Sequence, residues 1–217
     1  MKLFLRYIVL MNMAKKGIST EASPMSWDDF QNLIGRMSFD GEQKISSKLK
    51  REQHYKFLLL ISFGCYFGLR IGDLLKLKWV DVYEKSQISI TEQKTQKLRE
   101  ITVNKTLAKL IKRYKQELNV TDLDTYIFTN NTGAKILSIQ YINRQLKAIF
   151  KEYKIKVKNP SSHTLRKSFG LRVFEINYKS DEALITLSHI FNHSNTSITR
   201  RYIGLEAEKI KDVYLSL

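Results

Sequence analysis

Most of the chain carries apolar residues at the three- and four-residue spacing that is typical of amphipathic helices. A first helix is expected to begin after Ser26, with Asp29 three residues later in the position that completes a capping box. Residues 54–67 are apolar almost all round, which indicates a buried central helix. Further helices are expected at about 105–117, 138–153, 163–178, 181–190 and 195–203, with a last amphipathic piece at 205–215.

The pattern changes to alternation between residues 87 and 103. The segments ISI and ITV have apolar residues at every second position, and the polar stretch TEQKTQKLRE separates them. This arrangement predicts a β-hairpin with an exposed basic tip. Residues 126–128 predict a third short strand, and the polar stretch 39–53 predicts a loop. The expected fold class is therefore mainly α with a small three-stranded antiparallel β-sheet.

Composition narrows the possible partners. The 217 residues include 37 Lys and Arg against 21 Asp and Glu, a formal net charge of +16. Such an excess favours a polyanion, and nucleic acid is the commonest one. The single cysteine, Cys65, excludes an intrachain disulfide framework and a Cys-based zinc finger, and it predicts a cytoplasmic location. No apolar run reaches the roughly 18 to 20 residues that a membrane span needs, so no membrane partner is expected.

Two segments place charged or polar residues three positions apart, which puts them on one face of a helix. In GLRIGDLL these residues are Arg70 and Asp73, and in HTLR they are His163 and Arg166. A guanidinium can donate two parallel hydrogen bonds to phosphate oxygens, and an imidazole can add another. Taken alone, each pair is also typical of a solvated helix surface.

Two further segments carry a candidate nucleophile and candidate proton donors. In FNHSNTSITRRY, His193 precedes Tyr202 by nine residues, and a tyrosine with a pKa near 10 needs cations or a base to become a nucleophile. The hairpin tip carries Lys94 and Lys97. His189 and His193 have the four-residue spacing of two metal ligands, but no HExxH pattern or carboxylate cluster accompanies them. We therefore expect no metal.

The order of the four segments resembles the tyrosine recombinase (phage integrase) family, over about residues 24–210. The shared pattern is an arginine in a GLRxx[DE]xxxL setting, a hairpin lysine, HxxR, and a histidine nine residues before a tyrosine. The resemblance implies that DNA is cut and rejoined through a 3′-phosphotyrosyl intermediate without a cofactor. By position it implies phosphate binding by Arg70 and Arg166, support from His163 and His193, proton donation by Lys94, nucleophilic attack by Tyr202, and a buttressing role for Asp73.

The function implied by the resemblance is that of a site-specific recombinase acting on double-stranded DNA, in association with the nucleoid. The resemblance also implies a homo-oligomer, a tetramer on DNA, held through a C-terminal tail whose apolar stripe includes Leu205, Ile210, Val213 and Tyr214. The same stripe would also suit packing on its own domain. Two other functions remain open: a type IB topoisomerase-like enzyme that relaxes DNA, and a non-catalytic DNA-binding module.

The expected organisation is an N-terminal tail or linker at residues 1–25 and a catalytic domain at residues 26–217. Two features depart from the family pattern. Asn192 stands before His193, where members commonly have glycine. Most members also carry an upstream helical core-binding domain, whereas about 25 residues precede the catalytic region here. Both a fragment of a longer protein and a short invertase-like member fit this length, and either Lys94 or Lys97 could be the general acid.

Overall fold

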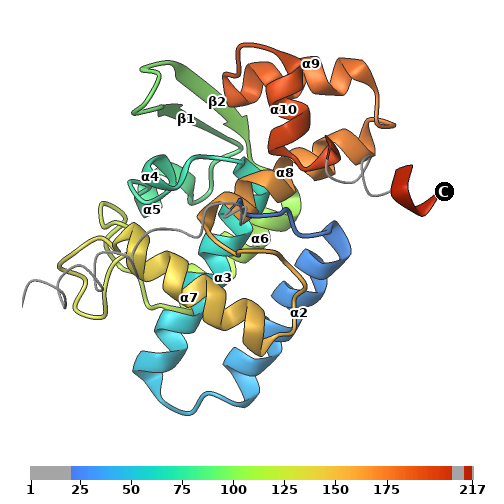
Figure 1. The fold of residues 1–217 in the computed structure, drawn as a ribbon. Helices are drawn as coiled ribbons and strands as arrows, with labels where there is room; N and C mark the ends of the chain where they lie inside the picture. Colours follow the sequence, from blue (N-terminus) through green and yellow to red (C-terminus); the bar gives the residue numbers. More distant parts are fainter. Residues whose placement is uncertain (1–20, 207–212, 217) are drawn as a thin grey trace, which may run out of the picture.

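The computed structural model describes residues 21–206 and 213–216. Its longest helix, α3 (Lys48–Phe67), runs through the middle of the molecule, and the apolar run from Phe57 onward is buried on all sides (Figure 1). The longer helices that pack directly on α3 include α2 (Trp27–Gln43), α6 (Lys105–Glu117) and α8 (Ser162–Ile176). The helix α7 (Ile139–Glu152) adds Ile142, Leu146 and Phe150 to the same core.

A second, smaller core lies beside the hairpin at the far end of α8 (Figure 1). It joins α8 to α9 (Asp181–Phe191) and α10 (Thr196–Tyr202). Gly170 of α8 allows this close approach, because a Cβ atom there would lie 2.6 Å from Ile203 and 2.9 Å from the Phe191 ring. The C-terminal helices are thereby held against α8 about one turn beyond the HTLR motif.

The hairpin is present where the alternation predicts it, as β1 (Gln87–Thr91) and β2 (Leu98–Thr102) paired antiparallel, with Ile88 opposite Ile101. The predicted third strand is wrong, because the sheet has two strands and residues 126–128 form only an isolated bridge, Lys78 with Tyr126. Lys78 is followed directly by α5 (Trp79–Val82), so the pairing with residues 126–128 does not extend into a strand. The apolar character of residues 126–128 instead reflects the burial of Ile127 and Phe128.

Helices α6 to α10 agree with the apolar spacing, whereas the loop predicted at 39–53 is too long and is reduced to residues 44–47. Helix α2 continues to Gln43 and α3 begins at Lys48. Packing stabilises this polar helical end, since Gly41 lies against the ring of Tyr55 so closely that a Cβ atom could not fit. The predicted N-cap is confirmed, because Ser26 accepts a hydrogen bond from the backbone of Asp29, but the Asp29 carboxylate accepts from the Ser26 hydroxyl and so does not complete the capping box. Most of the amphipathic piece predicted at 205–215 lies outside the described residues.

Within residues 21–206 and 213–216, no helix is both long enough and apolar enough to cross a membrane.

Candidate active site

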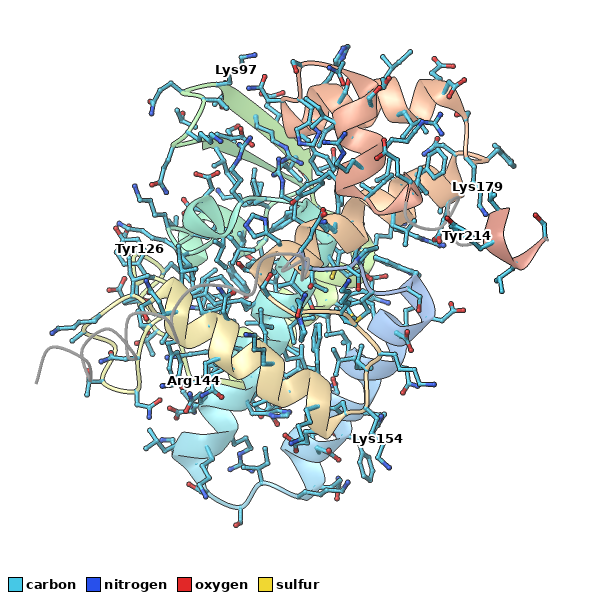
Figure 2. All side chains as sticks on the ribbon, viewed as in Figure 1. Lys97, Tyr126, Arg144, Lys154, Lys179 and Tyr214 are labelled. Carbon is cyan, nitrogen blue, oxygen red and sulfur yellow. The ribbon has the colours of Figure 1, made fainter. Side chains whose placement is uncertain are left out.

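A cavity of about 450 Å³ lies between the hairpin, the start of α4 (Ile71–Leu74), the first turns of α8, and the α9–α10 corner. Side chains from these four regions crowd this part of the molecule (Figure 2). The six residues that the sequence predicts as catalytic all line the cavity, and they come from segments up to 132 positions apart, since Arg70 and Tyr202 are both among them. The full lining is Leu69, Arg70, Ile71, Lys94, Thr95, Ser162, His163, Arg166, Asn192, His193 and Tyr202.

Arg70 owes its place to the glycine that ends α3. Gly68 has φ of 57°, in the left-handed region, and a Cβ atom there would lie 2.3 Å from the Phe169 ring. The chain therefore reverses at Gly68, and Arg70 becomes the N-cap residue of α4. Its guanidinium donates to the Glu92 carboxylate at 2.5 Å and to the Phe191 carbonyl at 3.1 Å.

Arg166 lies on α8 and is only 5% exposed. Its guanidinium donates to the Gly68 carbonyl at 2.5 Å and to the Phe191 carbonyl at 3.3 Å, and it covers the Phe191 ring at 4.5 Å. Burial lowers the pKa of Arg166 to about 10, so the group stays charged at neutral pH. Both arginines are thus fixed on one carbonyl before any anion arrives.

The two histidines are held in the neutral form. Partial desolvation, together with the positive charges of Lys167 and Arg166, keeps the pKa of His163 below its usual 6.5. Desolvation also lowers the pKa of His193, with Arg166 and Arg70 adding to the effect. Nδ1 of His193 is hydrogen bonded to the buried Thr199 hydroxyl at 2.9 Å, which fixes the ring.

Tyr202 is the last residue of α10 and packs within a group of aromatic rings. The centre of its ring lies 5.3 Å from the ring centres of both Phe191 and His193. Burial raises the pKa of its hydroxyl, and the Arg166 guanidinium opposes that rise. Lys167 lies 5.1 Å from the ring centre, and its ammonium is held by Glu21 at 2.5 Å.

The two hairpin lysines differ in their contacts. Lys94 lines the cavity, whereas Lys97, labelled on the hairpin in Figure 2, donates to the Asn192 side chain at 2.8 Å. Asn192 has φ of 55° and caps the end of α9. Asparagine tolerates this left-handed conformation better than other non-glycine residues, which explains how it can stand where a glycine is common.

Two polar residues beside the cavity, the buried Glu92 and the partly buried Arg99, were not predicted from the sequence. Glu92 accepts from Arg70, and Arg99 donates to the carbonyls of Phe67 and Gly68 at 2.7 and 3.4 Å. Glu92 continues the inward-facing alternation of Ile88 and Ile90, so strand periodicity could have predicted its burial. Asp73 accepts from the Gln93 backbone at 2.9 Å, and this contact ties α4 to the hairpin.

Among residues 21–206 and 213–216, no group of three or more His, Cys, Asp or Glu side chains is arranged to hold a metal ion. The chemistry available in the cavity is that of cations, neutral imidazoles and a phenol, which suits an anionic ester.

Comparison with known proteins agrees with this chemistry. The model of the phage integrase family matches residues 36–209. A probable integrase/recombinase of Bacillus subtilis (strain 168), YoeC, is 30% identical over 177 residues, which cover 82% of this chain and 92% of that protein. Tyrosine recombinase XerD of Listeria innocua is 30% identical over 152 residues, covering 68% of this chain and 49% of XerD. This chain therefore spans about half the length of XerD.

Solved structures share the fold. The XerA recombinase gives a TM-score of 0.63 at 23% identity, over 89% of this chain and 64% of that one. The Tn1549 transposon integrase in complex with transposon right end DNA gives 0.64 at 16% identity, over 96% of this chain and 70% of that one. At this identity the likeness concerns the arrangement of helices and hairpin, which is the arrangement that forms the cavity.

Proposed function

The chain belongs to the phage integrase family of tyrosine recombinases, and from this premise we propose that it is a site-specific DNA recombinase using Tyr202 as its nucleophile. One observation carries the proposal. Two arginines, two histidines, a lysine and a partly buried tyrosine line a single cavity, although they come from segments far apart in the sequence. The other features of the site fit the same reaction.

The reaction replaces one phosphoester with another. The Tyr202 oxygen attacks the scissile phosphorus, the bond from phosphorus to the 5′-oxygen breaks, and a 3′-phosphotyrosyl link forms. Negative charge gathers on the non-bridging oxygens as the attack proceeds. Arg70 and Arg166 stabilise this charge, and because their guanidinium groups are already anchored, little reorganisation is needed. The new ester retains the energy of the old one, so no nucleotide cofactor takes part.

Two protons must move during cleavage. A neutral His163 is suited to accept the proton of Tyr202, and Lys94 to donate one to the departing 5′-oxygen. For His193 we infer the tautomer in which Nδ1 accepts from the Thr199 hydroxyl. The hydrogen then lies on Nε2, where it can be donated to a phosphate oxygen.

Double-stranded DNA is the proposed partner, bound largely through its backbone because of the net charge of +16. Structures of the related XerH recombinase and lambda integrase hold DNA substrates, and the latter is a dimer on its site. We propose a tetramer linked by the C-terminal tail, in the nucleoid of the cytoplasm. The exposure of Val213, Tyr214 and Leu215, at 53%, 74% and 73%, supports this role (Figure 2). We further propose residues 26–217 as the catalytic domain.

The deciding experiment captures the covalent intermediate. A library of nicked random-sequence duplexes is incubated with the protein, and adducts that survive denaturation are counted. The wild-type chain is expected to form adducts and Tyr202→Phe none, because the ring remains but the attacking oxygen is lost. The matched control is Tyr178→Phe, since Tyr178 is 96% exposed on the turn before α9 and should leave adduct formation unchanged.

Other outcomes would point to the remaining functions. Adducts formed by Tyr202→Phe would show that another residue is the nucleophile. Tight DNA binding without adducts from the wild-type chain would identify a binding module. Relaxation of supercoiled DNA by a monomer, without exchange between duplexes, would identify a topoisomerase.

A further inference from the structure

A buried carboxylate lies directly behind the proposed phosphate site. Glu92 follows the last residue of β1 and is only 3% exposed. Its Oε2 atom accepts from Arg70 at 2.5 Å and from the Thr95 hydroxyl at 2.9 Å, and its Oε1 atom lies 3.7 Å from Arg99. Burial alone would raise the pKa of Glu92, but the hydrogen bonds from Thr95 and Arg70 hold it below its usual value. The carboxylate is therefore ionised at neutral pH.

The backbone of Glu92 belongs to the turn that carries Lys94. Its N–H donates to the Lys97 carbonyl at 3.0 Å, and its own carbonyl accepts from Gln96 at 2.8 Å. The next residue, Gln93, donates its backbone N–H to Asp73 on α4. The carboxylate thus has a fixed position relative to the hairpin turn and to α4 at the same time.

The contact with Glu92 leaves Arg70 able to bind an anion. One terminal nitrogen of the guanidinium faces Glu92 and the other faces the Phe191 carbonyl, so two of its five N–H groups are occupied. The side chain remains 25% exposed and lines the cavity. Glu92 therefore holds the guanidinium in one orientation without filling the site.

We propose that Glu92 is the positioning residue for Arg70: its carboxylate aims the guanidinium at the scissile phosphate and ties that orientation to the hairpin. This inference rests on the proposed recombinase function. In the alternative role, Glu92 would act through Lys94 by holding the hairpin in place for proton delivery. The two routes can be separated by changing the leaving group of the DNA.

The experiment measures single-turnover cleavage of a captured target duplex by the full chain. Glu92→Gln keeps the shape of the side chain but removes its charge, and it is expected to slow cleavage about 10²-fold, as a misplaced binding group does. The matched control is Glu100→Gln, which makes the same charge change at an exposed position of β2 and should stay within about twofold of the wild type.

A second substrate distinguishes the two routes. In a duplex with a sulfur at the 5′-bridging position, the leaving thiolate needs no proton donor. Lys94→Ala should regain most of its rate on this substrate, whereas Glu92→Gln should not. In an Arg70→Lys background, Glu92→Gln should add less than about a twofold further loss, because its effect passes through Arg70.

Thermal unfolding shows whether each variant is folded. Glu92→Asp serves as a second variant, because it keeps the negative charge but its side chain is one methylene shorter. A folded Glu92→Asp is expected to lose about tenfold in cleavage rate. Cleavage by a folded Glu92 variant at the wild-type rate would overturn the inference, as would rescue of Glu92→Gln by the sulfur substrate or a full additional loss in the Arg70→Lys background. A wild-type chain that forms no adduct would instead overturn the proposed function, and the inference with it.

Discussion

The arginines and the hairpin lysine line the same cavity, but the structure holds them in different ways. Arg166 is 5% exposed and is anchored on two carbonyls, and Arg70 is anchored on a carboxylate and a carbonyl. Lys94, by contrast, is exposed on the turn between β1 and β2. The guanidinium groups that we propose to stabilise negative charge are therefore preset, whereas the proposed proton donor is an exposed side chain on a turn.

The largest effect on the cleavage rate is expected from the loss of one of the two anchored arginines. Arg166→Ala should slow single-turnover cleavage about 10³-fold, because an anchored donor to the transition state is lost. The control is Arg172→Ala on the same helix, whose guanidinium lies on the Trp27 ring at 5.1 Å and does not line the cavity. A loss below about tenfold for Arg166→Ala would show that anchoring has no catalytic value here.

Substitution of the hairpin lysines should reduce the cleavage rate less than substitution of Arg166, and the two lysines should differ from each other. Lys94→Ala is expected to lower the cleavage rate about 10²-fold through the missing proton. Lys97→Ala loses only its hydrogen bond to Asn192 and should change the rate by about threefold or less. The same cleavage assay measures both variants, and the reverse ranking would assign the general acid to Lys97.

A change in the scaffold beneath Arg70 should reduce stability. Gly68→Ala must place a methyl group against the Phe169 ring at a left-handed position, and about 2–3 kcal/mol of unfolding free energy should be lost. Gly133 also has a positive φ, of 75°, but open space around its Cα. Gly133→Ala should therefore cost only about 1 kcal/mol in the same urea titration. Equal losses would show that the contact with Phe169 is unimportant.

The smallest effect concerns the two histidines. Because their pKa values are lowered on folding, the unfolded chain binds more protons than the folded one below the usual value of 6.5. Stability should therefore be fully present about one pH unit above 6.5, and it should fall as the pH decreases through 6.5 and through the lowered pKa values of the two histidines. Replacing His163 and His193 together by Gln should flatten this part of the unfolding profile, and an unchanged slope would contradict the assignment.

The sequence predicted those parts of the molecule that local patterns determine. Apolar spacing located α6 to α10 within about two residues of their ends. The six candidate residues were found because each belongs to a short motif on one element. Their convergence on one cavity followed from the resemblance and not from periodicity.

Features that depend on distant packing were not predicted. Residues 39–43 are helical because of their contact with Tyr55, and their own composition is polar. Ile127 and Phe128 are buried without pairing in a sheet. A short apolar run is typical of a buried strand and of a buried loop alike, so the sequence could not separate the two. The acceptors of both arginines include main-chain carbonyls, which any residue supplies, so no side chain in the sequence marks them.

One of those acceptors, the Phe191 carbonyl, is shared by Arg70 and Arg166 at the last turn of α9. Carbonyls at a helix C-terminus lack an intrahelical partner and carry partial negative charge, so they attract cations. Alanine scanning cannot remove this oxygen, because every substitution at position 191 retains it. This shared contact of the two arginines therefore cannot be removed by a substitution at position 191, and an atomic change in the main chain, such as an ester in place of the amide after residue 191, would weaken it directly.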